Sequence, residues 1–438
     1  MASSPSSYLI VGAGVFGVST AYHLLKKYPG ASVTLVDRDA FDAASRVAAS
    51  WDWNKVVRSD YDDFVYCRLA IEAQDVFETD PDWKPYFTKS GVYWMCRSAY
   101  ARAVIANHER LGRADDVFAV PIAEARKMYG GLFDKADYTD VTEVLVNKSS
   151  GWAAAGDALR AITRRSIEMG LNYVTAQVTS LRFDKSGACR GAKISTGEVL
   201  TASHVILCTG AYTATLLEQS AATSGLTSLR AEHRIVAGGI TTGMRKLSDD
   251  VYPKFANMPV GFQGYSAEVG GFIGSLPPTP DTHEMKWWGQ TIFKNTREVL
   301  PGRYVSVPPS APDYAQWKVS KQLKDDIKHA AEVFYGKETD SWKFDKHRIC
   351  WDAFTSSGDF IISPHAAAKG LYVATCGSFH GYKFFPVLGK YIVQMLEGEL
   401  EPELADKWAW DRQRPDAMLN PEFPRAEMVD LEDTVSKL

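Results

Sequence analysis

The chain has 438 residues, of which 45% are hydrophobic, and a formal net charge of −4. A chain of this length exceeds what one hydrophobic core normally supports, so two domains are expected, and the composition excludes a disordered or fibrous protein. The weak negative charge argues against nucleic acid and anionic membrane surfaces as partners, which leaves a small molecule as the expected substrate.

Cysteine usage and the two ends of the sequence bear on location. The six cysteines show neither a C-x-x-C pair nor a Cys/His ligand spacing, so the sequence predicts a reducing compartment, with no metal site and no disulfide framework. Residues 1–17 lack the regions of a signal peptide, and no stretch is apolar over the length of a membrane span. We therefore expect a chain that is neither secreted nor membrane-spanning. The tripeptide Ser436-Lys437-Leu438 matches the signal of the peroxisomal import receptor, which predicts a peroxisomal location.

The first forty residues carry the pattern of a βαβ unit. A short apolar strand over residues 8–11 is followed by a glycine-rich turn, a helix to about residue 27 and a second strand over residues 31–36. This order of elements, with an acidic residue at the end of the second strand, is typical of a dinucleotide-binding unit.

Three glycines of the turn have the spacing that a bound pyrophosphate requires. Gly12 would form the tight turn, Gly14 would let backbone N–H groups approach the phosphates, and Gly17 would let the helix pack on the strand. Asp37 would accept hydrogen bonds from the ribose hydroxyls. The neighbouring residues predicted to contact the cofactor are Val15, Phe16 and Arg38.

Further along, the chain alternates between helical and strand patterns and then changes character. Between about residues 227 and 345, Trp, Pro and Gly accompany short strands, which indicates a separate antiparallel domain. We therefore expect an α/β fold in which a Rossmann-type domain is joined to an α+β substrate domain with a mixed antiparallel sheet. The predicted segments are 1–90, 151–226 and 346–438 for the first domain, and 91–150 and 227–345 for the second.

The glycine-rich turn and four further rows together resemble one family over nearly the full length. The rows are DWNKVVR at 52–58, EMKWW at 284–288, RICW at 348–351 and GSFHGYKFFP at 377–386. They resemble the sarcosine-oxidase-type flavoprotein amine oxidases, which include the fungal fructosyl-amino-acid oxidases (amadoriases) and the pipecolate and saccharopine oxidases. The resemblance implies that the dinucleotide is FAD.

The resemblance gives roles to the basic residues of the first two rows. Arg58 would anchor a substrate carboxylate by a bidentate contact, and Lys55 would lie near the flavin as a catalytic residue and cofactor contact. Two buried cations so close in sequence would need anionic partners. Lys286 would promote the reaction with oxygen by stabilising the forming superoxide charge. The fructosyl-amino-acid oxidases match the first row through N-K-V without the arginine, so Arg58 favours an amino acid with a free carboxylate.

The third row contains the expected point of flavin attachment. Cys350 matches the family cysteine that carries the 8α-methyl group of the flavin as a thioether, so the FAD is expected to be covalent. Without this resemblance, Cys350 would be read as an inert thiol in an apolar strand.

The fourth row resembles the family's loop that closes over the flavin. Its backbone N–H groups would face the pyrimidine end of the flavin, where negative charge gathers on reduction. Lys383 is expected to be the second carboxylate anchor, and His380 is either catalytic or a structural residue of the loop. The other cofactor contacts predicted in this loop are Gly377, Phe379, Gly381 and Tyr382, with Lys383 itself. Outside the loop they are Ser45 and Arg46 at the pyrophosphate, Val178 at the adenine, and Gly210.

The predicted function is an FAD-dependent oxidase of a secondary-amine amino acid of the pipecolate or saccharopine kind. A hydride equivalent would pass to the flavin from the Cα or N-alkyl carbon of the C–N bond, which becomes an imine, and O₂ would reoxidise the flavin, giving H₂O₂. The alternatives are a fructosyl-amino-acid oxidase, an N-methyl aromatic amino acid oxidase of fungal alkaloid biosynthesis, and a flavin dehydrogenase with a non-oxygen acceptor. A monomer is expected.

Two observations bear on these alternatives. The three carboxylates of saccharopine would need further cations, for which Arg245, Arg303 and Arg348 are the candidates. An aromatic substrate would suit a group of aromatic residues, namely Trp51, Trp53, Trp287, Phe379 and Tyr382.

Overall fold

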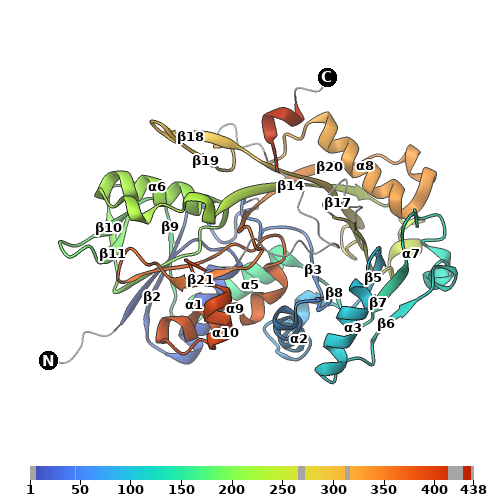
Figure 1. Ribbon diagram of the computed structural model, residues 1–438, viewed down its shortest axis with the longest axis horizontal. Coiled ribbons are helices and arrows are strands. Elements are labelled where there is room, and N and C mark those ends of the chain that lie inside the picture. The colour runs from blue at the N-terminus through green and yellow to red at the C-terminus, as the bar shows by residue number, and fades with distance from the viewer. Residues whose placement is uncertain (1–5, 45, 265–271, 311–315, 413–427, 436–438) are drawn as a thin grey trace.

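The structure is a computed structural model that describes residues 6–44, 46–264, 272–310, 316–412 and 428–435. Two large sheets dominate it (Figure 1). Ser45 and the tripeptide 436–438, both predicted to be functional, lie outside the described residues. Within the described residues, no helix combines the length and apolar character needed to cross a membrane.

The first sheet has six strands in the order β21-β22-β13-β1-β2-β9. All neighbours are parallel except β21 and β22, which pair antiparallel. The bounds are β1 Ser7–Val11, β2 Ser32–Asp37, β9 Asn172–Thr175, β13 His204–Leu207, β21 Ile361–Pro364 and β22 Leu371–Thr375.

Both faces of this sheet are covered, which explains the continuous apolar run at its centre. In β1, Ile10 packs into one hydrophobic cluster while Leu9 and Val11 pack into another, because successive side chains of a strand point to opposite faces. The first cluster contains residues of the helices α1 (Val15–Lys27), α5 (Ala155–Glu168) and α9 (Phe385–Glu397). Helix α1 packs against both of the other two.

The second sheet has nine strands and is mainly antiparallel. Eight strands follow the order β20-β14-β17-β16-β15-β5-β7-β6, and β23 pairs with β17. The bounds are β5 Val92–Cys96, β6 Val117–Val120, β7 Glu143–Asn147, β14 Val236–Lys246, β15 Val260–Gly264, β16 Phe272–Leu276, β17 Glu284–Lys294, β20 Lys346–Phe354 and β23 Val429–Asp430.

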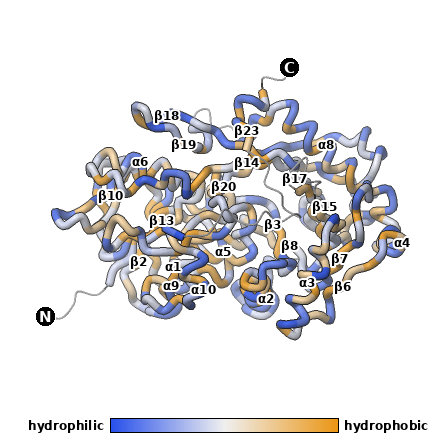
Figure 2. The backbone as a smooth tube through the Cα atoms, in the orientation of Figure 1, coloured by the Kyte–Doolittle hydropathy of each residue, from blue (hydrophilic) through white to orange (hydrophobic). Residues whose placement is uncertain are grey.

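Helix α8 (Lys321–Tyr335) packs against β14, β16 and β17 of the second sheet. Its buried residues include a set that recurs at helical spacing, namely Leu323, Ile327, Ala330, Ala331 and Phe334. In Figure 2 hydrophilic residues prevail along the hairpin β18–β19 (Thr296–Leu300 and Arg303–Ser306), whereas many interior strands are hydrophobic.

Smaller elements complete the structure. The remaining helices are α2 Phe64–Thr79, α3 Tyr100–Arg110, α4 Ile122–Ala125, α6 Thr213–Ser224, α7 Tyr252–Phe255 and α10 Pro402–Lys407. Two three-stranded sheets are β10 Val178–Phe183, β11 Cys189–Ile194 and β12 Val199–Thr201, and β3 Lys55–Val57, β8 Gly151–Ala153 and β4 Phe87–Thr88.

The observed architecture confirms the predicted fold class, a parallel Rossmann-like sheet joined to a mixed, mainly antiparallel one. The domain limits stay a prediction. Strand β20, which starts the last segment predicted for the first domain, pairs with β14 along its whole length and so belongs to the second sheet.

Candidate functional site

A cavity of about 1180 Å³ is lined by residues from both sheets. The first sheet contributes the carboxyl ends of β1, β2, β13 and β22, which is where parallel α/β sheets place their ligands. The second sheet contributes side chains from β14, β17 and β20. One cavity thus joins the predicted dinucleotide unit to the predicted substrate domain.

At the first end of the cavity, close packing requires the glycines. Gly12 has a φ of +104°, and a Cβ atom there would lie 2.4 Å from the carbonyl oxygen of Cys208. A Cβ at Gly17 would lie 1.9 Å from the oxygen of Gly12, and Gly17 does not line the cavity. Gly17 therefore serves the packing of the turn, as expected.

The amino end of α1 faces the cavity through Gly14, Val15 and Phe16. The first N–H groups of a helix lack intrahelical partners, so this end attracts a phosphate group. Across from it, the buried hydroxyl of Ser50 has no hydrogen-bond partner among the described residues, lines the cavity and lies 3.3 Å from the position of a Gly14 Cβ. A hydroxyl without a protein partner at this position can donate a hydrogen bond to a pyrophosphate. The residues present therefore fit the expected FAD.

Asp37 is held by neighbouring groups at the end of β2. Its Oδ2 accepts a hydrogen bond from Ala13 N at 2.7 Å and lies 3.0 Å from Nη2 of Arg46. Its Oδ1 accepts from Asp39 N at 2.9 Å. Arg46 is buried and does not line the cavity, so it supports Asp37 from behind, and its predicted contact with the pyrophosphate stays a prediction.

At the same end of the cavity the side chains of Arg38 and Tyr212 stack on each other. The sequence interpretation predicted Arg38 as a cofactor contact but did not identify Tyr212. The Arg38 guanidinium lies 4.3 Å from the centre of the Tyr212 ring, and both residues line the cavity with Val178 and Gly210. Tyr212 follows the glycine turn after β13, and this position after a parallel strand was a signal that could have identified it.

At the other end, a buried carboxylate joins two of the predicted lysines. Asp52 Oδ2 lies 3.0 Å from Lys55 Nζ, and Oδ1 lies 3.0 Å from Lys286 Nζ. Arg348 approaches Oδ2 to 3.7 Å. Both lysines line the cavity, whereas Asp52 and Arg348 lie behind them. Asp52 is thus the anionic partner of Lys55, one of the two cations expected to need one, whereas Arg58 donates to the carbonyl oxygen of Asp60. The sequence interpretation did not single out Asp52, although it begins the row DWNKVVR.

These charges change one another's pKa. Burial lowers the pKa of Lys286 to about 8, although the Asp52 carboxylate acts in the opposite direction. Burial alone would raise the pKa of Asp52, but Lys286, Lys55 and Arg348 hold it below its ordinary value. Burial alone would lower the pKa of Lys55, but Cys350 and Asp52 raise it. The cluster is therefore coupled, with Lys286 the cation closest to losing its proton.

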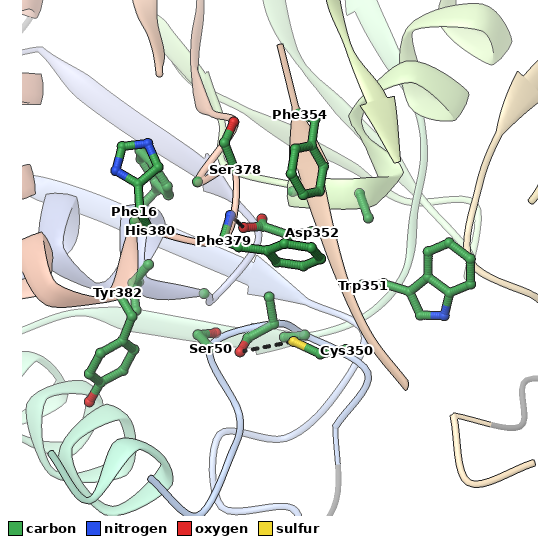
Figure 3. A pocket seen from close by; sticks show the side chains of 18 of the residues that line it. Phe16, Ser50, Cys350, Trp351, Asp352, Phe354, Ser378, Phe379, His380 and Tyr382 are labelled. Carbon is green, nitrogen blue, oxygen red and sulfur yellow. Dashed lines mark hydrogen bonds between the residues drawn. The ribbon is translucent and has the colours of Figure 1, made fainter. Parts of the chain in front are cut away.

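Cys350 on β20 points into the cavity (Figure 3). Its Sγ lies 3.4 Å from Lys55 Nζ and 3.9 Å from the carbonyl oxygen of Ala49. The next residue, Trp351, points to the other side of the strand, as the alternation of side chains requires. Cys350 is buried at 1% exposure, yet its sulfur faces the same space as the predicted flavin residues.

The loop that follows β22 is held in an unusual backbone conformation. Ser378 and Phe379 have φ values of +46° and +61°, which side chains other than glycine rarely adopt. Asp352 on β20 stabilises the loop, because its Oδ2 accepts from Phe379 N at 2.9 Å, and burial raises the pKa of this carboxyl. A Cβ at Gly377 would lie 2.9 Å from the same oxygen. The sequence interpretation did not identify Asp352, because its hydrogen-bond partner, Phe379, lies 27 residues away in the chain.

Backbone strain such as the positive φ angles of this loop is often found at ligand-binding sites. All of the loop residues predicted to contact the cofactor line the cavity, namely Gly377, Phe379, Gly381, Tyr382 and Lys383. The Phe379 ring packs edge-on against Phe354, and the Tyr382 hydroxyl points away toward the carbonyl oxygen of Ala155 at 3.5 Å (Figure 3).

Both ring nitrogens of His380 have protein partners. Nε2 lies 2.9 Å from the carbonyl oxygen of Gly358, which can only accept, so Nε2 carries a proton. In the neutral ring, Nδ1 then accepts from the Tyr61 hydroxyl at 3.0 Å. This arrangement favours a structural role for His380, and its catalytic role stays a prediction.

Arg58 and Lys383 approach the cavity from different elements. Arg58 is buried at 4% exposure within an aromatic box, and its guanidinium lies 4.5 Å from the Tyr61 ring and 4.8 Å from the Trp94 ring. Lys383 Nζ donates to the carbonyl oxygen of His380 at 2.9 Å and lies 5.5 Å from the same Tyr61 ring. Burial, and next to it the charge of Arg58, lower the pKa of Lys383 well below its usual value. The two predicted anchors are therefore brought together.

Several further residues named from the sequence are not at the cavity. None of the three arginines considered for extra carboxylates lines it, because Arg245 lies over the Trp342 ring, Arg303 pairs with Glu218, and Arg348 lies behind Asp52. Trp51, Trp53 and Trp287 do not line it either. The aromatic residues that do line this end include Tyr61, Phe262, Phe272, Trp288 and Phe354. In the part of the chain that is described, no group of three or more His, Cys, Asp or Glu could hold a metal ion.

Comparison with known proteins adds three findings. A family model described as DAO, FAD dependent oxidoreductase, matches residues 7–395. L-saccharopine oxidase of Schizosaccharomyces pombe is 25% identical over 429 residues, which is 92% of each chain, and the amino acid oxidase imqH of Aspergillus flavus is 24% identical over 459 residues, with 90% of this chain and 93% of that one covered. The structure of fructosyl peptide oxidase from E. terrenum matches with a TM-score of 0.82 and 22% identity, covering 99% of this chain and 98% of the other.

Proposed function

The chain belongs to the family of FAD-dependent oxidoreductases, and from this premise we propose that it oxidises a secondary-amine amino acid with one free carboxylate, using O₂ as electron acceptor. The family membership confirms the predicted cofactor, FAD, and the predicted class of enzyme. When bound, FAD supplies the acceptor for a hydride equivalent, which carries both electrons, from the carbon next to the substrate nitrogen. The proposal therefore concerns the substrate and the residues around it.

The observation that carries the proposal is the proximity of Arg58 and Lys383. Both cations lie against the Tyr61 ring, at 4.5 Å for Arg58 and 5.5 Å for Lys383, and the Arg58 charge lowers the pKa of Lys383 in this buried cavity. A carboxylate bound between them would relieve this repulsion and would gain two charge-assisted hydrogen bonds. The rings of Tyr61 and Trp94, and the hydrogen bond from Arg58 Nη1 to the carbonyl oxygen of Asp60, limit the orientations of the planar guanidinium.

The walls beyond this pair suit a neutral amine. Lys55 and Lys286 also line the cavity, and their charges would repel an ammonium ion, so the substrate amine would enter unprotonated. The lone pair needed for hydride loss would then be present without a general base.

The placement of the arginines considered for further carboxylates favours a substrate with a single carboxylate. The curated relative named L-saccharopine oxidase supports a secondary amine as substrate. Saccharopine, however, carries three carboxylates, and the arginines considered for them, Arg245, Arg303 and Arg348, do not line the cavity. Pipecolate or an N-alkyl amino acid therefore fits the described residues better. A fructosyl amino acid is the second candidate, favoured by the fold shared with the fructosyl peptide oxidase.

Lys286 is the proposed site of oxygen reduction. Its ammonium lines the cavity on the strand β17, and a buried cation next to developing superoxide would lower the barrier to electron transfer.

A screen by peroxide release tests the substrate. We expect pipecolate and N-alkyl amino acids to release one H₂O₂ per molecule oxidised, with lower rates for saccharopine and fructosyl amino acids. Fast release of H₂O₂ with fructosyl amino acids alone would favour the second candidate substrate, a fructosyl amino acid. Oxidation of an amino acid with a dye acceptor but no peroxide would identify a dehydrogenase.

Covalent attachment through Cys350 is the second part of the proposal. Its Sγ faces the cavity, and Lys55 Nζ lies 3.4 Å away. Acid denaturation should leave the flavin on the parent polypeptide and release it from Cys350→Ala. As a matched control, Cys376→Ala, which changes a buried thiol outside the cavity, should keep the flavin bound. Release of free flavin from the parent would contradict the thioether.

The proposed compartment is the peroxisome, for which Ser436-Lys437-Leu438 is the address. Catalase in that compartment would remove the peroxide. A fluorescent protein fused to the amino end should enter peroxisomes, and deletion of the tripeptide should leave it in the cytosol. Entry without the tripeptide would contradict this address.

A further inference from the structure

The carboxylate of Asp52 lies at the centre of the buried charges behind the cavity. One oxygen contacts Lys286 of β17, and the other contacts Lys55 of β3 and lies 3.7 Å from Arg348 of β20. A single side chain therefore bridges three strands that are far apart in the sequence. Removal of one member of a buried ion pair leaves an uncompensated charge, so the state of each cation depends on this carboxylate.

We propose that Asp52 is a positioning residue for the reaction with oxygen, whose carboxylate keeps the ammonium of Lys286 charged and directed along the wall of the cavity. The inference rests on the role proposed above for Lys286. The second contact of Lys286, to the carbonyl oxygen of Asn54 at 2.5 Å, comes from the same segment as Asp52, so this segment orients the amine through two acceptors.

Among the groups around Lys286, Asp52 is the one whose charge stabilises the ammonium most. The charged or titratable groups around it are Asp52, Lys55 and Arg348, Glu284 of its own strand, and Cys350 as long as this thiol is not bonded to the flavin. Glu284, two residues earlier on β17, is bound by Lys346 at 2.5 Å. The paired strands β14 and β16 place neutral residues opposite Lys286, namely Met244 and Leu276. Among the described residues, Asp52 is thus the carboxylate in direct contact with this amine.

The direction in which each neighbouring charge shifts the pKa of Lys286 follows from its sign. Burial lowers the pKa of Lys286 to about 8, the Asp52 charge raises it, and the Lys55 charge lowers it. Because the charged amine is the form that assists oxygen reduction, reoxidation should slow as the pH rises through the pKa of Lys286. Without the Asp52 carboxylate, the amine would lose its proton at lower pH. Without the Lys55 ammonium, it would keep its proton to higher pH.

The test compares the pH dependence of flavin reoxidation by stopped flow in the holoenzyme and three variants. Asp52→Asn should move the fall in rate to lower pH by about one to three pH units, the range expected for loss of a contacting opposite charge. Lys55→Met should move it to higher pH. Lys286→Met should be slow and without this pH dependence.

The two opposite shifts separate an electrostatic role from a merely structural one. Loss of packing would lower FAD content and thermal stability in both variants but would not move the pH profiles in opposite directions. FAD content, the unfolding midpoint and the affinity of the oxidised flavin for sulfite, measured across the same pH range, provide readouts other than turnover. If Asp52→Asn does not retain FAD, the Lys55→Met shift and partial restoration by Asp52→Glu decide the question.

The outcomes distinguish the two levels of the proposal. Unchanged profiles in Asp52→Asn and Lys55→Met, with slow reoxidation in Lys286→Met, would reject the role of Asp52 and leave that of Lys286 intact. Normal reoxidation in Lys286→Met would instead reject the role of Lys286.

Discussion

The two ends of the cavity bind by different physical means. At the end near Gly12 and α1, backbone N–H groups and tightly packed glycines form the surface. At the end near Cys350, charged side chains from segments far apart in the sequence meet around Asp52 and in the pair Arg58 and Lys383. Steric fit controls the first end and charge balance the second. Substitutions should therefore abolish function at the first end and change it by degrees, with pH dependence, at the second.

The largest effect is expected from Gly12→Ala. Its methyl group would meet the Cys208 carbonyl oxygen at 2.4 Å in a backbone conformation that disfavours side chains, which should cost about 3 kcal/mol or more and prevent FAD binding. The measurements are FAD content and the free energy of unfolding. Gly30→Ala is the matched control, because Gly30 also has a positive φ but open space around it, so it should lose only about 1 kcal/mol. Normal FAD content in Gly12→Ala would contradict the steric account of this end.

The next largest effect concerns Lys286. Replacement by Met should slow flavin reoxidation about 10²- to 10³-fold while anaerobic reduction by the substrate stays fast. Stopped-flow measurement of the two half-reactions checks this. Lys294→Met, on the same strand but away from the cavity, should change neither. Equal slowing of both half-reactions would show that Lys286 supports the site as a whole.

A smaller effect is expected at the carboxylate anchor. Arg58→Lys keeps the charge but loses the bidentate fork and the stacking on Tyr61 and Trp94, so kcat/KM should fall about 10- to 100-fold, mainly through KM. Steady-state kinetics with an amino acid substrate test this. The control Arg68→Lys changes an ion pair on the surface of α2 and should have no effect. An unchanged KM in Arg58→Lys would remove Arg58 from the substrate site.

The smallest effect is expected from Tyr61→Phe, which removes the hydrogen bond to His380. If His380 is structural, the protein should lose about 1 kcal/mol of stability and the rate of flavin reduction should stay nearly constant. Chemical denaturation and anaerobic reduction measure the two quantities. A large loss in reduction rate with unchanged stability would return His380 to a catalytic role.

The same contrast explains what the sequence could predict. The first end is formed by residues 12–17 and Asp37, which are close in sequence, so their spacing indicated both the fold and the site. Arg58 and Lys383 were identified through a family resemblance, since nothing local shows that they meet in space. Asp52 and Asp352 were missed because their importance depends on partners far away, Lys286 for the first and Phe379 for the second. Arg46 contacts Asp37 and does not line the cavity, a placement that the sequence could not predict, since an arginine near the turn could face either way; its contact with the cofactor stays a prediction.

The central claim is that the cavity selects an amine through its carboxylate. Its most direct test is anaerobic bleaching of the flavin by pipecolate and by piperidine, which differ only in the carboxylate, in the parent enzyme and in Arg58→Gln. We predict that the parent is reduced rapidly by pipecolate and slowly by piperidine, and that Arg58→Gln largely removes this preference. Equal bleaching of the parent by both amines, or a preference that survives in Arg58→Gln, would contradict the account.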